Sequence, residues 1–175
     1  YPQAMFKAVE AAQRSTEVKI HFVMAGWFPS GERDRARFGD AARCYAPGVN
    51  ILFQDGNDVQ IVAQCWAASD IFLLLSDTIL ETFGQAPVEA MAAGAVPITT
   101  RVGGIPDVMQ DGVHGLLVEA KDPAGLARAI ARLDDDRDAL TRMAEAGRQR
   151  VLAEYTVERL AQDFKRIYAT LIKGN

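Results

Sequence analysis

Two apolar segments flank a loop and a helix-forming stretch in the middle of the chain, and they constrain the fold more than any other feature. Residues 71–76 form an almost continuous apolar run, which is typical of a strand buried on both faces. Residues 96–99 are a second short strand candidate. Between them, Pro87 lacks an N–H group and therefore suits the first turn of a helix, and Gly94 suits its end. We therefore predict a strand–helix–strand unit here.

The same alternation continues along the whole chain of 175 residues. It predicts an α/β fold with a doubly wound parallel sheet, followed by extra C-terminal helices. A hydrophobic content of 49% is enough for one domain with a full core. The predicted strands are 18–25, 50–54, 71–76, 96–99 and 115–118, and the predicted helices are 2–14, 31–43, 58–68, 87–93, 105–109, 123–133, 137–154 and 156–172.

The loop before the central helix has the features of a site for a ligand that carries phosphates and hydroxyls. Gly84 lets the backbone turn tightly or approach a ligand closely. The N–H groups and the positive dipole end at a helix start favour a phosphate. Glu81 precedes the helix and Glu89 lies in it, eight positions later. Carboxylates accept hydrogen bonds from sugar hydroxyls, so we expect the amides to hold phosphates and the acids to hold sugars.

These residues resemble a known family of enzymes. The pattern of Glu81, Phe83, Gly84, Glu89 and the residues 90–97 is similar to the E-x7-E signature of retaining GT-B glycosyltransferases, family 4, also called glycosyl transferases group 1. The resemblance continues through residues 102–108, 111–118 and 122–123. It covers roughly residues 18–133, and it implies the Rossmann-like C-terminal, donor-binding half of a GT-B fold.

The resemblance also implies a role for each candidate site residue. Glu89 would bind the ribose hydroxyls of a nucleotide-diphosphate sugar, and Glu81, the catalytic candidate, would orient the donor sugar. The base would lie near residues 54–56. No metal or other cofactor is expected. The further donor-binding candidates are Phe83, Gly84, Gln85 and Ala86 at the helix start, with Gly103 and Gly104 in the next loop.

Other parts of the family pattern lie outside this sequence. In the family, the donor domain opens with a strand and a loop carrying an Arg and a Lys-Gly, and an N-terminal acceptor domain comes first. We therefore expect a fragment that does not turn over by itself, whose partners are a nucleotide sugar, an unknown acceptor and the N-terminal domain of the same chain, which could also supply peripheral membrane contact. An exposed apolar stripe on the last helices, at Leu160, Phe164 and Ile167, would fit such a domain. The alternative is a non-catalytic module that senses nucleotide sugars or binds a partner.

Charge, cysteine spacing, apolar runs and glycine motifs argue against several other classes of protein. A net charge of −4 and no basic face argue against a nucleic-acid partner. Cys44 and Cys65 have no metal-ligand spacing, and we interpret them as buried free thiols in a reducing cytoplasm. No apolar run approaches the roughly 18 residues of a membrane span. No G-x-G-x-x-G follows a strand, which disfavours a dinucleotide oxidoreductase.

Several polar residues have a structural explanation that we prefer to a catalytic one. We expect His21 to be packed in its strand, His114 to face solvent and Asp107 to be a helix-start acid. The aspartates 134–136 are interpreted as a loop whose last member caps the next helix, rather than as a metal site. For Phe83, both core packing and site lining stay open. The arginines 33, 35 and 37 are expected on the solvated face of a helix, and Asp77 in a turn.

Overall fold

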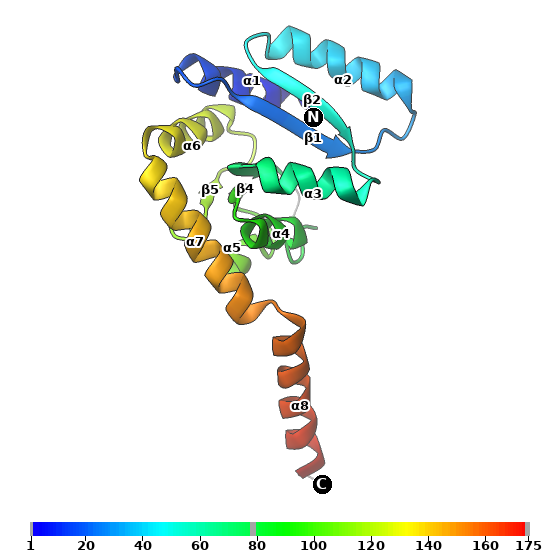
Figure 1. The fold of residues 1–175 in the computed structure, drawn as a ribbon, viewed down its shortest axis with the longest axis vertical. Helices are drawn as coiled ribbons and strands as arrows, with labels where there is room; N and C mark the ends of the chain where they lie inside the picture. The colour runs from blue at the N-terminus through cyan, green and yellow to red at the C-terminus, as the bar shows by residue number, and fades with distance from the viewer. Residues whose placement is uncertain (1, 78–79, 174–175) are drawn as a thin grey trace.

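A computed structural model describes residues 2–77 and 80–173. Its elements follow the predicted order, with most boundaries within a few residues of prediction. Figure 1 shows their arrangement. The strands are β1 (His21–Gly26), β2 (Asn50–Asp55), β3 (Ile71–Leu74), β4 (Val96–Thr100) and β5 (Leu116–Val118), and the helices are α1 (Pro2–Arg14), α2 (Glu32–Tyr45), α3 (Val59–Ala68), α4 (Gln85–Ala93), α5 (Ile105–Val108), α6 (Pro123–Asp135), α7 (Arg137–Glu154) and α8 (Val157–Lys173).

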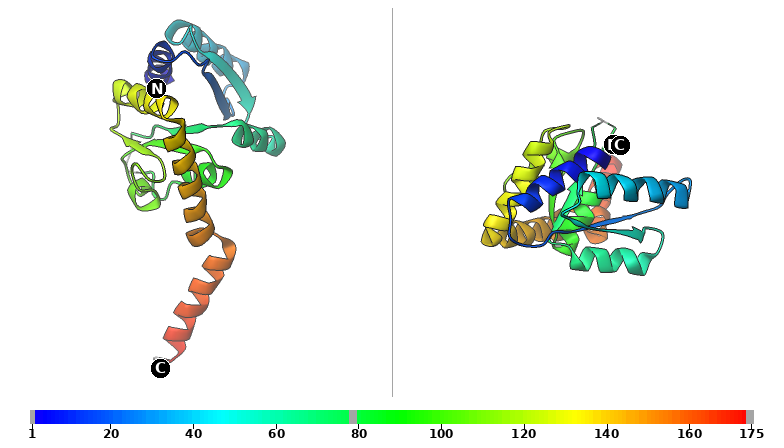
Figure 2. Two further views of the ribbon diagram at one scale, coloured as in Figure 1. Left: turned by 60° about the vertical axis from the view of Figure 1, so that its left-hand side comes forward. Right: turned by 90° about the horizontal axis from the view of Figure 1, so that it is seen from above.

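The described strands form two parallel sheets rather than one. β1 pairs with β2, while β4 lies between β3 and β5. Seen from above, β1 and β2 lie between α1 and α2 on one face and α3 on the other (Figure 2). The α/β class and the parallel pairing are confirmed, and helices cover both faces of the strands.

Burial differs sharply between β3 and β4. All five residues of β4 are buried, because it has a strand on each side. Every residue of β3 is only half-buried, so the prediction of a strand buried on both faces is wrong here. Within the described residues, β3 pairs with β4 alone. The other edge of β3, like one edge of β1, has no strand beside it among residues 2–77 and 80–173.

Two hydrophobic clusters hold the molecule together. The larger joins α1 and α6 to both sheets, with Phe6, Ile98 and Leu133 fully buried in it. The smaller lies under α4, α5 and α7 and centres on Met91 and Ile105. This second cluster supports the helix start where the predicted site lies.

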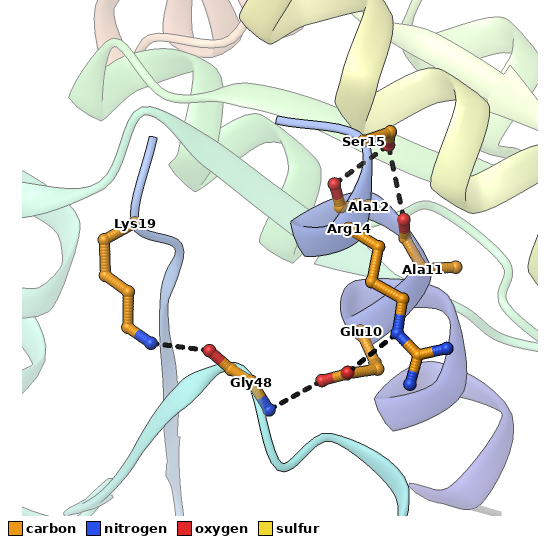
Figure 3. Close-up of polar contacts among 7 residues, drawn as sticks. All are labelled: Glu10, Ala11, Ala12, Arg14, Ser15, Lys19 and Gly48. Atoms are coloured by element: carbon orange, nitrogen blue, oxygen red, sulfur yellow. Dashed lines mark hydrogen bonds and ion pairs between the residues drawn. The ribbon is translucent and has the colours of Figure 1, made fainter. Parts of the chain in front are cut away.

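A buried carboxylate fastens α1 to the loop before β2. Glu10 accepts hydrogen bonds from the Gly48 N–H at 2.8 Å and from Arg14 Nε at 3.0 Å (Figure 3). Lys19 Nζ donates to the Gly48 carbonyl, and Ser15 bonds the last carbonyls of α1. These bonds satisfy a carboxylate that would otherwise be costly to bury.

The predicted helix caps are confirmed. Asp58 accepts from two amides at the start of α3, Asp122 accepts from Gly125 N, and Asp136 accepts from Ala139 N at 2.8 Å. Two members of the aspartate run, Asp134 and Asp135, lie in the last turn of α6 rather than in a loop. Asp134 accepts a hydrogen bond from Thr16 Oγ1, so it serves a local structural contact.

The last helix, α8, extends away from the rest of the molecule (Figures 1 and 2). The exposed apolar stripe predicted at Leu160, Phe164 and Ile167 is confirmed. Val157, Tyr168, Leu171 and Ile172 are exposed on the same helix. An exposed apolar surface of this extent on one helix is a candidate docking surface.

Three predictions about single residues are wrong. His21 is exposed rather than packed, with its ring 2.9 Å from Asn50 Nδ2 on the neighbouring strand, because β1 is an incompletely covered strand. Cys44 is exposed and Cys65 is half-buried, so neither is a buried thiol.

Among the residues described, no helix has both the length and the apolar content needed to cross a membrane.

Candidate functional site

The loop of residues 81–84 and the start of α4 form a compact turn around Glu81. Gly84 adopts φ +80°, a conformation that favours glycine, and its N–H donates to Glu81 Oε1 at 3.2 Å. The carboxylate of Glu81 is thereby fixed at the helix start rather than free in solvent. Gly94 closes the same helix at φ +88°, as predicted.

The next loop backs this turn by direct backbone contact. Gly104 N–H donates to the Glu81 carbonyl at 3.0 Å. A Cβ on Gly104 would lie 2.0 Å from the Thr82 carbonyl oxygen, so only glycine fits there. Gly103 has φ +53°. The two loops, which were predicted as separate parts of the binding site, are therefore packed directly against each other.

The start of α4 offers amides, and the helix offers a second carboxylate. Gly84 gives no side-chain cap, and the first-turn N–H groups of a helix, here those of Gln85 and Ala86, have no intrahelical partner. Glu89 is exposed and accepts from Gln85 Nε2 at 3.0 Å. A carboxylate has capacity for several hydrogen bonds, so this one bond leaves Glu89 able to accept more.

Phe83 is half-exposed at 49%, and its ring packs against Tyr155. The two centroids are 5.8 Å apart with the rings at 75°, an edge-to-face contact. Phe83 therefore both packs and borders solvent next to Glu81. Tyr155 was not among the candidates from the sequence, where it fell between two predicted helices.

His114 is buried, so the expectation that it faces solvent is wrong. Its Nδ1 accepts from the Gln110 N–H at 3.0 Å. Burial lowers the pKa of His114 below its usual value of 6.5, and the nearby positive charge of Arg150 lowers it further, against an opposing effect of Glu154. The ring thus links the 111–115 turn to Gln110, in the segment that follows α5.

The other polar candidates lie where a structural role predicts. Asp107 is in the first turn of α5, and the arginines 33, 35 and 37 are exposed on α2. Asp77 forms an ion pair with Lys121 at 3.7 Å. Within residues 2–77 and 80–173, no group of three or more His, Cys, Asp or Glu side chains is arranged to share a metal ion.

A separate apolar pocket of about 150 Å³ lies at the carboxyl end of β1. It is lined by Trp27, Phe28 and Phe38, among others, and not by the candidate site residues. Gly56, in the loop predicted to lie near a base, donates its N–H to the Gly26 carbonyl at 2.9 Å beside this pocket. The loops after β1 and β2 therefore meet at the same end of their sheet.

Chemically, the 81–94 region carries groups suited to an anion and groups suited to a polyol. The helix start supplies N–H donors and a positive dipole end for negative oxygen atoms. Glu81 and Glu89 supply acceptors for hydroxyl groups, one held by its own loop and one on the exposed helix face. No nucleophile–base pair is needed for such a site to position a ligand.

Comparison with known proteins identifies relatives of the chain and structures of the same fold. N-acetyl-alpha-D-glucosaminyl L-malate synthase of Bacillus anthracis is 38% identical over 114 residues, which are 65% of this chain and 29% of that protein. Sucrose-phosphate synthase from Thermosynechococcus elongatus superposes with a TM-score of 0.77 at 26% identity, over 100% of this chain and 44% of that one. Anabaena HepE in complex with UDP-glucose gives a TM-score of 0.77 at 20% identity, over 95% of this chain and 44% of that one, a likeness of fold alone.

The chain thus spans under a third of the curated relative and under half of each solved chain. The structural likenesses confirm the Rossmann-like α/β fold of a GT-B C-terminal half. The family model described as Glycosyl transferases group 1 matches residues 2–150, from α1 into the last turns of α7. Since that match covers most of the chain, the protein belongs to the glycosyl transferases group 1 family.

Proposed function

We propose that this chain is the donor-binding half of a retaining glycosyltransferase of family 4, which transfers a sugar from a nucleotide-diphosphate donor to an acceptor. Glu89 binds the ribose hydroxyls, and Glu81 orients the donor sugar near the reacting carbon. The amides of residues 83–86 meet the sugar and the distal phosphate. Those amides and the α4 dipole stabilise the negative charge that develops on the departing diphosphate.

The observation that supports this proposal is the hydrogen-bonded contact between the loop of residues 81–84 and the loop of residues 103–104. Gly84 and Gly104 both donate backbone hydrogen bonds to Glu81, one to its carboxylate and one to its carbonyl. An acid held in this way at an open helix start suits a ligand with both hydroxyls and phosphates. HepE, which shares this fold, was solved with UDP-glucose, and that supports a nucleotide sugar as the ligand class.

We further propose that transfer requires a longer polypeptide in the cytoplasm, without a metal or other cofactor. One edge of β1 and one edge of β3 have no partner strand in the part of the chain that the structure describes, and each can bond a strand placed between them. Such a strand would come from the segment that leads into α1, since a helix joining parallel strands follows a strand. The exposed apolar face of α8 would pack on the acceptor domain of the same protein. Both surfaces fit a chain that spans only part of its relatives.

The test is saturation-transfer NMR of the protein with UDP, GDP and ADP and with their sugars. We expect one nucleotide to bind, and Glu89→Ala to weaken its binding by about 1–3 kcal/mol through loss of a charge-assisted hydrogen bond. Glu145→Ala is the matched control, because Glu145 is also an exposed helical glutamate, bonded to Gln149 four positions on at 2.7 Å. Equal affinities in the two variants would refute the ribose assignment.

Turnover separates the enzyme from the alternative, a module that senses nucleotide sugars. The full polypeptide should transfer sugar with retention of the anomeric configuration, read by NMR of the product. Nucleotide binding without transfer in that polypeptide would favour the sensing module instead.

A further inference from the structure

The end of α7 lies directly beside the 81–84 loop. Tyr155 follows the last residue of α7 and precedes α8, and its N–H donates to the Val151 carbonyl at 2.9 Å. Its ring is half-buried and makes an edge-to-face contact with Phe83. The junction between two helices thus contacts the loop that carries Glu81.

The loop is also held by the segment that leads into α5. Gly104 contacts Glu81 and Thr82 there, and a Cβ on Gly84 would meet Ile105 Cγ1 at 3.3 Å. These contacts fix how close the loop approaches α5. The Phe83 side chain of the loop contacts Tyr155 at the end of α7.

The last turns of α7 are a firm support for such a contact. A Cβ on Gly147 would lie 2.9 Å from Met91 Cγ, so α7 packs closely against α4. Val151 is buried in the smaller hydrophobic cluster, and Tyr155 packs at its border. Arg150 donates to the Asp107 carbonyl at 3.0 Å, which ties α7 to α5. Tyr155 is therefore carried by a segment fixed to both helices that frame the site.

We propose that Tyr155 is a positioning residue of the donor site, because its ring holds Phe83 and thereby keeps the 81–84 loop and Glu81 in their bonded arrangement. Tyr155 acts through Phe83 and does not itself contact the donor. The relevance to sugar transfer rests on the function proposed above. The positioning itself is a property of the ligand-free protein.

Amide hydrogen exchange measured by NMR, without any nucleotide, tests this inference. The reporters are the N–H groups of Gly84 and Gly104, which both donate to Glu81. Tyr155→Ala should lower the protection of both amides about two- to tenfold, the range expected for loss of an aromatic pair. Tyr155→Phe keeps the ring and should keep the protection. Val96 N–H, bonded to the Asp70 carbonyl at 2.9 Å, is the reference and should not change.

Tyr168→Ala is the matched control, since it removes an exposed ring stacked on Phe164 in α8, 6.2 Å away. It should leave both reporters unchanged. Unchanged reporters in Tyr155→Ala, an equal loss at Val96, or no rescue by Tyr155→Phe would each overturn the proposal. If Tyr155→Ala does not fold, Phe83→Leu removes the same contact from the loop side and must give the same local loss. Because nucleotide is absent, failure here is distinct from failure of donor binding.

Discussion

Substituting Gly104 with alanine isolates the contact that joins the two loops of the candidate site. Gly104 has φ −83° and ψ −1°, which alanine adopts without strain. Backbone entropy alone would therefore make Gly104→Ala stabilising, by about 0.4–1 kcal/mol. The new Cβ, however, would lie 2.0 Å from the Thr82 carbonyl oxygen, a backbone atom that cannot rotate away.

The steric overlap decides whether Gly104→Ala raises or lowers the free energy of unfolding. Overpacking of this kind costs about 1–3 kcal/mol. Moving the loop also weakens the Gly104–Glu81 hydrogen bond, which contributes about 0.5–1.5 kcal/mol. We expect Gly104→Ala to lower the free energy of unfolding by about 0.5–4 kcal/mol after the entropic gain is subtracted, with a central value of about 2 kcal/mol.

Urea unfolding followed by circular dichroism measures this difference. Gly39→Ala is the control, because Gly39 lies within α2 and its Cβ would meet only Arg43 Nη1, at an ordinary 3.5 Å. That variant should be more stable than the parent by up to about 1 kcal/mol. A Gly104→Ala protein as stable as the parent would refute the close packing of the two loops.

Two further outcomes follow from named side chains. His114 has a lowered pKa in the folded state, so the unfolded state binds more protons once the pH falls below about 6.5. The free energy of unfolding should then fall from pH 7.5 to pH 5 more steeply in the parent than in His114→Gln, and equal slopes would contradict the burial of a neutral ring. Asp58 accepts from Gln60 N at 2.9 Å and Ile61 N at 3.2 Å, so Asp58→Ala should cost about 1 kcal/mol in urea unfolding. Asp58→Asn should retain most of that stability, and a cost equal to that of the alanine variant would argue against the cap.

Local chemistry made most of the fold predictable from the sequence. Gly94, Pro87 and Asp58 each mark a helix end by a property of one residue, and the structure has each where the sequence placed it. The strand order was less accessible, since pairing depends on contacts between segments distant in the chain. The division into two sheets was not predicted for that reason.

The residues of the candidate site could be predicted from the sequence, but the residues that pack around them could not. Glu81, Gly84 and Gly104 were nominated by motif, and the structure joins all three through hydrogen bonds. Tyr155 carries no motif, and its contact with Phe83 spans 72 positions of sequence. The burial of His114 was not predicted because the environment of its ring depends on α7. Arg150 of α7, whose charge affects the pKa of His114, lies 36 positions further along the chain.

The disagreement at β3 has a physical explanation that bears on function. A continuous apolar strand such as residues 71–74 belongs inside a parallel sheet, with neighbours on both edges and helices on both faces. Here β4 has that environment and β3 does not. The pattern and the exposure are reconciled if a strand completes the sheet between β1 and β3, as proposed above. The carboxyl end of that strand would lie beside the carboxyl end of β3, and the loop that follows it would face the start of α4. The segment that completes the sheet would then also complete the site.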